Sequence, residues 1–131
     1  MLFRSDPLCI DLQILNHIQD CKEDYNKIGR VYLPLTFLKK YNVKLEQLKK
    51  NYTEQNLRLA INEILFHTEK LINEADKFKK IMKNNKLSKE TTFILEIAKS
   101  LLKLLKKKDP LRNKVVLKKF DYIKCFVKTF L

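Results

Sequence analysis

The chain has 131 residues, of which 45% are hydrophobic and 33% are charged, and it contains only one glycine and three prolines. This length and balance predict a single folded, helix-rich domain and exclude a largely disordered protein. The net charge of +13 predicts a cationic surface, and the lack of any apolar run near 20 residues, roughly what a bilayer requires, excludes a membrane-spanning helix.

The first predicted element is a long helix that begins near Pro7 and ends at about Lys27. Ser5 and Asp6 offer capping side chains, and proline suits the first helical position because its φ is already fixed. Apolar residues at steps of three and four predict one buried stripe on this helix: Ile14, Ile18, Cys21, Tyr25 and Ile28. Gly29 follows, where a helix commonly ends in a left-handed residue.

The middle of the chain predicts shorter elements and then a second long helix. Residues 30–34 are typical of an extended connector, and Pro34 can open a short helix that reaches Tyr41. Lys44 to Lys50 predict a further turn or two. Thr53 is a good cap for the long helix that follows. Its apolar positions recur with helical spacing: Leu57, Ile61, Ile64, Leu65, Thr68, Leu71, Ile72, Ala75, Phe78 and Met82.

Two more helices complete the predicted fold. Residues 84–85 break the long helix, and Ser88 caps the next one. That helix buries a further apolar set: Leu95, Ala98, Leu102 and Leu105. Residues 109–110, Asp-Pro, end it and start the last helix, from Leu111 to about Phe130. Because no alternation typical of β-strands persists anywhere, the predicted fold class is all-α.

The C-terminal end carries most of the positive charge. From residue 99 onward there are eleven Lys or Arg and two acids. In the last predicted helix, lysines alternate with apolar residues, a pattern that favours contact with an anionic membrane surface. Simple packing of the apolar side, with solvated lysines, explains the pattern equally well. Nucleic acid is disfavoured as a partner, since only four of the 28 basic residues are Arg.

One polar face of the first helix carries the most specific chemistry. Asp20, Glu23 and Asp24 have the spacing that projects three carboxylates from one side, and Gln13 and Asn16 lie on the same side. Clustered carboxylates without Cys or His suit Mg²⁺, which commonly adds water and phosphate oxygens to one or two acids. The alternative is a solvated acidic helix face.

The surrounding residues resemble a known family. Residues 13–25, QILNHIQDCKEDY, and residues 30–34, RVYLP, are similar to the second aspartate-rich segment of the squalene/phytoene synthases. The variant of the motif, with Ser5, Asp6 and Cys9 before it, resembles most closely the bacterial branch that makes squalene for hopanoids. A looser resemblance continues to residues 109–115, DPLRNKV. It implies an all-α fold, the C-terminal half of an isoprenoid-synthase-type helical bundle, with residues 1–131 forming a single partial domain.

The resemblance also implies a metal site. Asp20 and Asp24 are implied to bind Mg²⁺, with Asn16 completing the site and Glu23 supporting it.

The implied substrate site uses other residues. Gln13 is implied to line the pocket, and Lys114 stands near the position of a family arginine that contacts the diphosphate. Leu101 stands near the position of a cavity tyrosine, whose hydroxyl it cannot replace. Gln19 stands where the synthases that condense two farnesyl diphosphates have an arginine, which argues against that condensation here.

The implied function is that of a truncated isoprenyl diphosphate transferase in squalene biosynthesis, with a prenyl or presqualene diphosphate as substrate. Family members are longer and carry a first aspartate-rich motif in their N-terminal half, and no second acidic cluster of that kind occurs here. We therefore expect the chain to be inactive alone and to need a complementary N-terminal half. The alternative function is a basic helical interaction protein that binds anionic membrane or nucleic acid.

The cysteines indicate the compartment. Cys9, Cys21 and Cys125 are odd in number, lack CxxC spacing and follow no signal peptide. The sequence thus predicts a cytoplasmic protein. The alternative within this compartment is a peripheral protein that contacts the inner face of the membrane.

Overall fold

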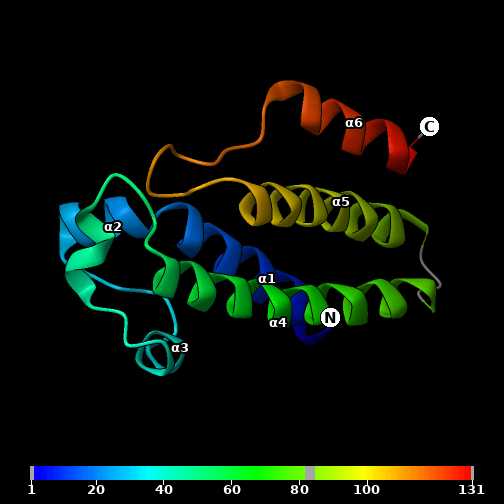
Figure 1. The fold of residues 1–131 in the computed structure, drawn as a ribbon. Helices are drawn as coiled ribbons and strands as arrows, with labels where there is room; N and C mark the ends of the chain where they lie inside the picture. Colours follow the sequence, from blue (N-terminus) through cyan, green and yellow to red (C-terminus); the bar gives the residue numbers. More distant parts are fainter. Residues whose placement is uncertain (1, 82–84, 131) are drawn as a thin grey trace.

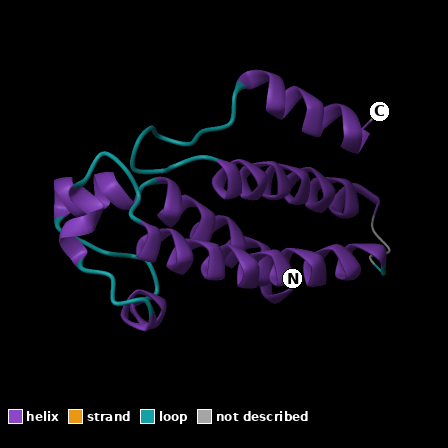
Figure 2. Cartoon of the chain, in the orientation of Figure 1, coloured by secondary structure: helices purple, strands orange, loops and turns teal. Residues whose placement is uncertain are grey.

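The computed structural model describes residues 2–81 and 85–130, with side chains described from residue 11 onward. Its elements follow in the order α1 (Leu2–Gln19), α2 (Cys21–Ile28), α3 (Leu35–Lys40), the 3-10 helix η1 (Leu45–Lys49), α4 (Gln55–Lys80), α5 (Asn85–Lys107) and α6 (Lys119–Phe130). Figure 2 shows helices and loops and no strand among these residues. The all-α prediction is confirmed.

Three long helices form the body of the molecule. α4 and α5 lie side by side, and α1 packs against both (Figure 1). α6 lies along the other side of α5, while α2 contacts η1 and α3 contacts α4 at the end of the bundle. None of the described helices carries an apolar stretch long enough to cross a bilayer.

The core lies where α1, α4 and α5 meet. α1 contributes Leu15 and Ile18, and both side chains are fully buried. The helical spacing correctly predicts most of the buried positions on the other two helices: Leu57, Ile61, Ile64, Leu65, Thr68, Ile72, Ala75, Leu95, Ala98, Leu102 and Leu105. Each buried Leu or Ile stabilises the fold by about 1.5–3 kcal/mol relative to exposure.

Some predicted core positions are exposed instead. Ile28 is 56% exposed and Phe78 is 51% exposed, and both lie in the last turn of their helices. Met82 lies outside the described residues.

The first helix differs from its prediction at both ends. α1 begins at Leu2, so Pro7 lies inside the helix and does not mark its start. The helix is also interrupted at Asp20, which has φ −102° and ψ 8°, before α2 continues the chain. α2 then ends as predicted at Gly29, whose φ of 62° lies in the left-handed region that glycine adopts without steric cost.

Two predicted caps have other roles. α4 begins at Gln55 with Glu54 at the cap position, and Thr53 instead donates from its backbone N–H and hydroxyl to Asp109. Ser88 lies inside α5, where its carbonyl accepts a hydrogen bond from the Thr92 hydroxyl at 2.8 Å. Asn84, half of the predicted helix break, lies outside the described residues.

The last predicted helix begins later than its pattern suggests. Residues 108–118 form a non-helical segment, which we call the strap, and α6 starts only at Lys119. Leu111 and Val115 of the strap are each 2% exposed. The Asp109 carboxylate accepts backbone N–H groups from Leu111 and Arg112 in a turn that does not continue as a helix. Tertiary burial of Leu111 and Val115 outweighs the helical propensity of the segment.

Candidate functional site

The predicted motif lies at the junction of α1 and α2. The Asp20 N–H donates to the Asn16 carbonyl at 3.0 Å, and the Asp20 carbonyl accepts from the Asp24 N–H at 2.8 Å. Helical hydrogen bonding therefore runs through the junction although the backbone angles of Asp20 depart from helical values. Cys21 points into the core, which turns the neighbouring acids outward.

Lys114 of the strap joins two of these acids. Its ammonium lies 3.4 Å from an oxygen of Asp20 and 3.5 Å from an oxygen of Glu23. The two side chains are 40% and 48% exposed, so solvent reaches the ion pairs. The charges of Asp20 and Glu23, with hydrogen bonds to both, raise the pKa of Lys114 above its ordinary value. On the alkaline side, the pairing is therefore lost only as the pH rises through the raised pKa of Lys114.

Two further side chains hold the strap on this junction. The Gln19 amide donates to the Val115 carbonyl at 2.7 Å. The Lys22 ammonium donates to the Leu111 carbonyl at 3.3 Å and to the Asn51 side chain at 2.8 Å. The sequence placed Lys114 near the motif only through a family resemblance, and nothing in its local pattern indicated these contacts of Gln19 and Lys22.

The remaining predicted residues are placed as follows. Gln13 and Asn16 are exposed on α1, on the helix face that leads to Asp20. Asp24 is partly buried in the first turn of α2. Across the described residues, no three acidic, His or Cys side chains converge into a group that could hold a metal ion. Leu101 is 4% exposed within the core cluster.

The two histidines and Tyr32 pack against aromatic neighbours. The His17 ring stacks on Tyr32 with ring centroids 4.8 Å apart, and Arg30 donates to the Tyr32 hydroxyl at 3.4 Å. His67 lies against Phe37 with centroids 5.4 Å apart. These contacts give both histidine rings a packing role.

A cationic hollow of about 400 Å³ opens beside the acids, on the strap. Its charged lining is Lys107, Lys108, Asp109, Arg112 and Lys114. The single acid in this set accepts hydrogen bonds from Thr53 and the strap backbone. Lys114 pairs with Asp20 and Glu23, so the positive charge of the hollow comes mainly from Lys107, Lys108 and Arg112. Lys114 belongs to both the acid pair and the hollow. The junction thus sets exposed and partly exposed carboxylates next to a surface that favours anions.

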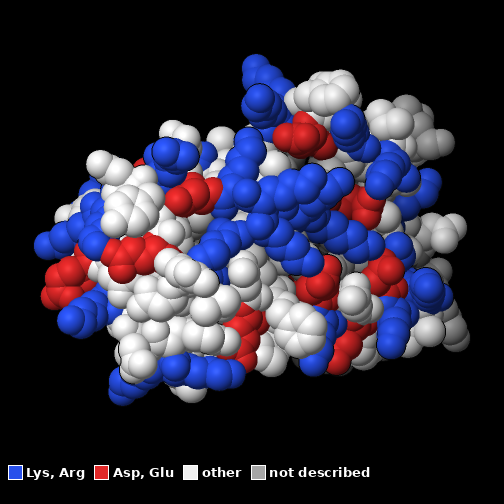
Figure 3. Space-filling model, in the orientation of Figure 1, with Lys and Arg blue, Asp and Glu red and all other residues white. Residues whose placement is uncertain are grey.

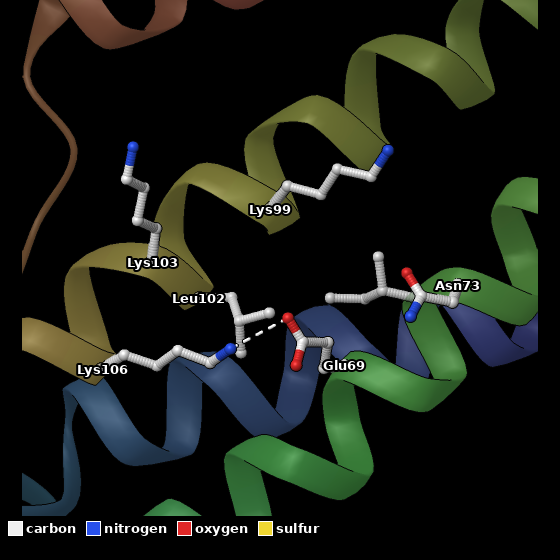
Figure 4. Close-up of a pocket in the computed structure, with 7 residues that line it drawn as sticks. Glu69, Asn73, Lys99, Leu102, Lys103 and Lys106 are labelled. Atoms are coloured by element: carbon white, nitrogen blue, oxygen red, sulfur yellow. Dashed lines mark hydrogen bonds and ion pairs between the residues drawn. The ribbon is translucent and has the colours of Figure 1, made fainter.

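A second groove lies between α4 and α5, apart from the acids. It has a volume of about 280 Å³, and Ile72 and Leu102 contribute its apolar lining. Figure 4 shows Lys106 of α5 reaching Glu69 of α4, at 2.9 Å, while Lys103 extends away from that pair. None of the predicted site residues lines this groove.

The helical bundle and its acid-bearing helix are those of an all-α protein of the isoprenoid-synthase type. The model of the squalene/phytoene synthase family matches residues 1–121, and the chain therefore belongs to that family. The hydroxysqualene synthase of Rhodopseudomonas palustris is 32% identical over 119 residues, which are 91% of this chain and 41% of that protein.

Two other relatives carry the same name. The hydroxysqualene synthase of Zymomonas mobilis is 32% identical over 85% of this chain and 37% of its own length. That of Sinorhizobium fredii is 30% identical over 91% of this chain and 41% of its own length. The chain thus spans about two fifths of the length of these curated relatives. No solved structure matches it.

Proposed function

We propose that this chain is the C-terminal part of an isoprenoid synthase and binds the diphosphate end of an isoprenyl or presqualene diphosphate. The observation that carries the proposal is the position of Lys114, which lies at once against Asp20 and Glu23 and on a hollow with three other cations. A diphosphate bound through a divalent cation needs both kinds of group within a few ångströms.

The residues present fit Mg²⁺ as the cofactor. The donor set is oxygen only, and the lysine ammonium already occupies the position of a cation between two carboxylates. Asp20 and Asp24 would hold the ion, with Asn16 and Glu23 in support. Bound there, Mg²⁺ would supply charge neutralisation for a departing diphosphate. Gln13 and Lys114 would contact the substrate.

The proposal includes a complementary N-terminal half. Two to four oxygen ligands at one helix junction, without acids from across a cavity, give only part of a site, and the matched relatives extend well beyond the region that this chain covers. We expect the purified chain to turn over neither farnesyl nor presqualene diphosphate unaided with Mg²⁺. Turnover by the chain alone would show that the half-site argument is wrong.

The binding role is tested with a non-hydrolysable substrate analogue. We expect the wild-type chain to bind a farnesyl thiodiphosphate analogue in a Mg²⁺-dependent manner, and Asp20→Ala and Asp24→Ala each to weaken that binding by about tenfold or more, because each removes an oxygen ligand. Titration calorimetry with and without Mg²⁺ measures the effect.

A matched control is Glu46→Ala, which removes an exposed acid of η1 outside the site. This variant should bind the analogue like the wild type. Equal binding by the wild type and both aspartate variants would remove the metal role from Asp20 and Asp24.

A specific observation favours a second candidate function, contact with an anionic membrane. The apolar residues of α6 are mostly exposed: Phe120 at 63%, Ile123 at 57%, Phe126 at 50% and Val127 at 45%. Figure 3 shows Lys and Arg side chains gathered over α5 and the adjoining part of α6. Exposed aromatic and aliphatic side chains beside lysines suit the interface of an anionic bilayer better than a nucleic acid. We propose that this contact takes place at the cytoplasmic face.

Vesicle pelleting tests the membrane contact. We expect the Phe120→Ser/Ile123→Ser double variant to bind phosphatidylglycerol vesicles about tenfold more weakly than the wild type, since two interfacial apolar groups are lost. The control double variant Leu59→Ser/Phe66→Ser changes two exposed apolar residues of α4 and should bind normally. Equal pelleting with zwitterionic and anionic vesicles, or equal loss in both variants, contradicts this function.

A further inference from the structure

The strap is fixed to the α1–α2 junction at two points four residues apart. At Leu111 and at Val115 the side chain is buried, and the backbone carbonyl of the same residue accepts a hydrogen bond from Lys22 or Gln19. Each point is therefore held by apolar burial and by a polar contact. Lys114, between them, is half exposed and free to extend toward the acids.

The Gln19 contact sets the register between strap and helix. Gln19 precedes Asp20, and Val115 follows Lys114, so the bond between the Gln19 amide and the Val115 carbonyl brings Lys114 beside Asp20. The two bonded residues are 96 positions apart in the chain. A slip of the strap by one residue would direct the Lys114 side chain away from the carboxylates.

From this geometry we propose that Lys114 is a tethered counter-ion of the site and that Gln19 is its positioning residue. Lys114 pairs with Asp20 and Glu23 in the free chain, offsets part of their charge and competes with any divalent cation for the same carboxylate oxygens. Once displaced, the ammonium remains held beside the cationic hollow, where phosphate oxygens would bind. The inference rests on the proposed function, because it assumes that a divalent cation binds Asp20.

Because the strap backbone is fixed, we expect the contacts of Lys114 with Asp20 and Glu23 to be stronger than an ordinary surface ion pair. Exposed pairs are usually weak because two long side chains must be ordered for a small Coulombic gain. Here one lysine meets two acids, and the strap backbone that carries it is already fixed by burial. Loss of both contacts is expected to change the affinity for a competing cation by roughly tenfold, which corresponds to about 1.4 kcal/mol.

The test measures Mn²⁺ binding to the full chain by electron paramagnetic resonance, with no substrate present. We expect Lys114→Met to bind Mn²⁺ about tenfold more tightly than the wild type, and Gln19→Leu to shift the affinity in the same direction. Lys108→Met is the matched control: it removes a cation from the same hollow, without a contact to Asp20 or Glu23, and should leave the affinity nearly unchanged.

A double variant separates positioning from general structural damage. If Gln19 acts through Lys114, then Gln19→Leu/Lys114→Met has the same Mn²⁺ affinity as Lys114→Met, whereas independent effects would add. Additive effects would remove the positioning role. If the wild type and Lys114→Met bind Mn²⁺ with equal affinity, the counter-ion role of Lys114 is refuted and the proposed metal site is not. Absence of Mn²⁺ binding in every variant, Lys114→Met included, overturns both the counter-ion and the proposed metal site.

Discussion

Replacing Asp11 with alanine is expected to raise the free energy of unfolding at pH 8 by about 3 kcal/mol, because it removes an unpaired charge from the core. Asp11 lies on the inner face of α1 with 0% exposure, and no described residue forms a hydrogen bond with either carboxylate oxygen. Burial, and to a smaller extent the negative charge of Glu74, raises the pKa of Asp11 from 3.8 to about 7. Urea unfolding of both proteins at several pH values measures the difference.

The raised pKa of Asp11 determines how the stability of the folded chain changes with pH. The folded chain binds the Asp11 proton more tightly than the unfolded chain, so this contribution to stability is complete below about pH 3.8 and is lost as the pH rises through about 7. The stability difference between Asp11→Ala and the wild type should therefore be small at pH 4 and fully developed at pH 8.

Asp11→Asn supplies the matched control for size. It removes the charge but leaves a buried amide without partners, so we expect a smaller gain at pH 8 than alanine gives. Parallel stability profiles for the wild type and Asp11→Ala from pH 4 to 8 would mean that Asp11 is not a buried, unpaired acid.

Asp109→Ala is expected to lower the free energy of unfolding at neutral pH by about 3 kcal/mol, because four donors lose a charged acceptor. The carboxylate accepts the Thr53 N–H at 2.8 Å, the Thr53 hydroxyl, the Leu111 N–H at 2.9 Å and the Arg112 N–H at 3.2 Å. It thereby ties the start of the strap to the segment before α4. Denaturant unfolding measures the loss.

The contribution of Asp109 to the free energy of unfolding changes with pH in the opposite direction to that of Asp11. Burial acts to raise the pKa of Asp109, but the hydrogen bonds from Thr53, Leu111 and Arg112 outweigh it and lower the pKa below 3.8. The stability that Asp109 contributes is therefore present above pH 3.8 and is lost as the pH falls through the lowered value. The defect of Asp109→Ala should shrink in strong acid.

Asp121→Ala is the control for Asp109, since it removes an aspartate that accepts a single backbone N–H, from Lys118 at 2.9 Å. We expect it to cost about 1 kcal/mol, the usual value of one capping contact. If the two variants lost equal stability, the four-donor role of Asp109 would be refuted.

Part of the candidate site follows from spacing alone. Gln13, Asn16 and Asp20 are three and four residues apart, which places them on one helix face wherever the helix packs. Glu23 keeps this relation across the junction because the hydrogen bonds from Asn16 to Asp24 continue through it. The combined role of the acids in binding Mg²⁺ stays a prediction until the variants above are measured.

The contacts of Lys114 could not be predicted from the same pattern. The apolar spacing from Leu111 onward favours a helix, yet Leu111 and Val115 are buried as parts of a strap, and Lys114 reaches the acids from outside any helix. The side chains that decide this, Gln19 and Lys22, lie more than 80 positions away. Local propensity is a weak prior that such contacts readily override.

The sequence by itself determined the all-α class and the inner faces of α4 and α5, because the helical period is a local property of the chain. It also determined the end of α2 at Gly29 and membership of the family, because turn chemistry and the motif are local as well. Tertiary structure decided the interruption at Asp20, the strap and the isolation of Asp11 in the core. These depend on which distant groups meet after the helices pack, and the free energy of burying or pairing such groups is not encoded in any local pattern.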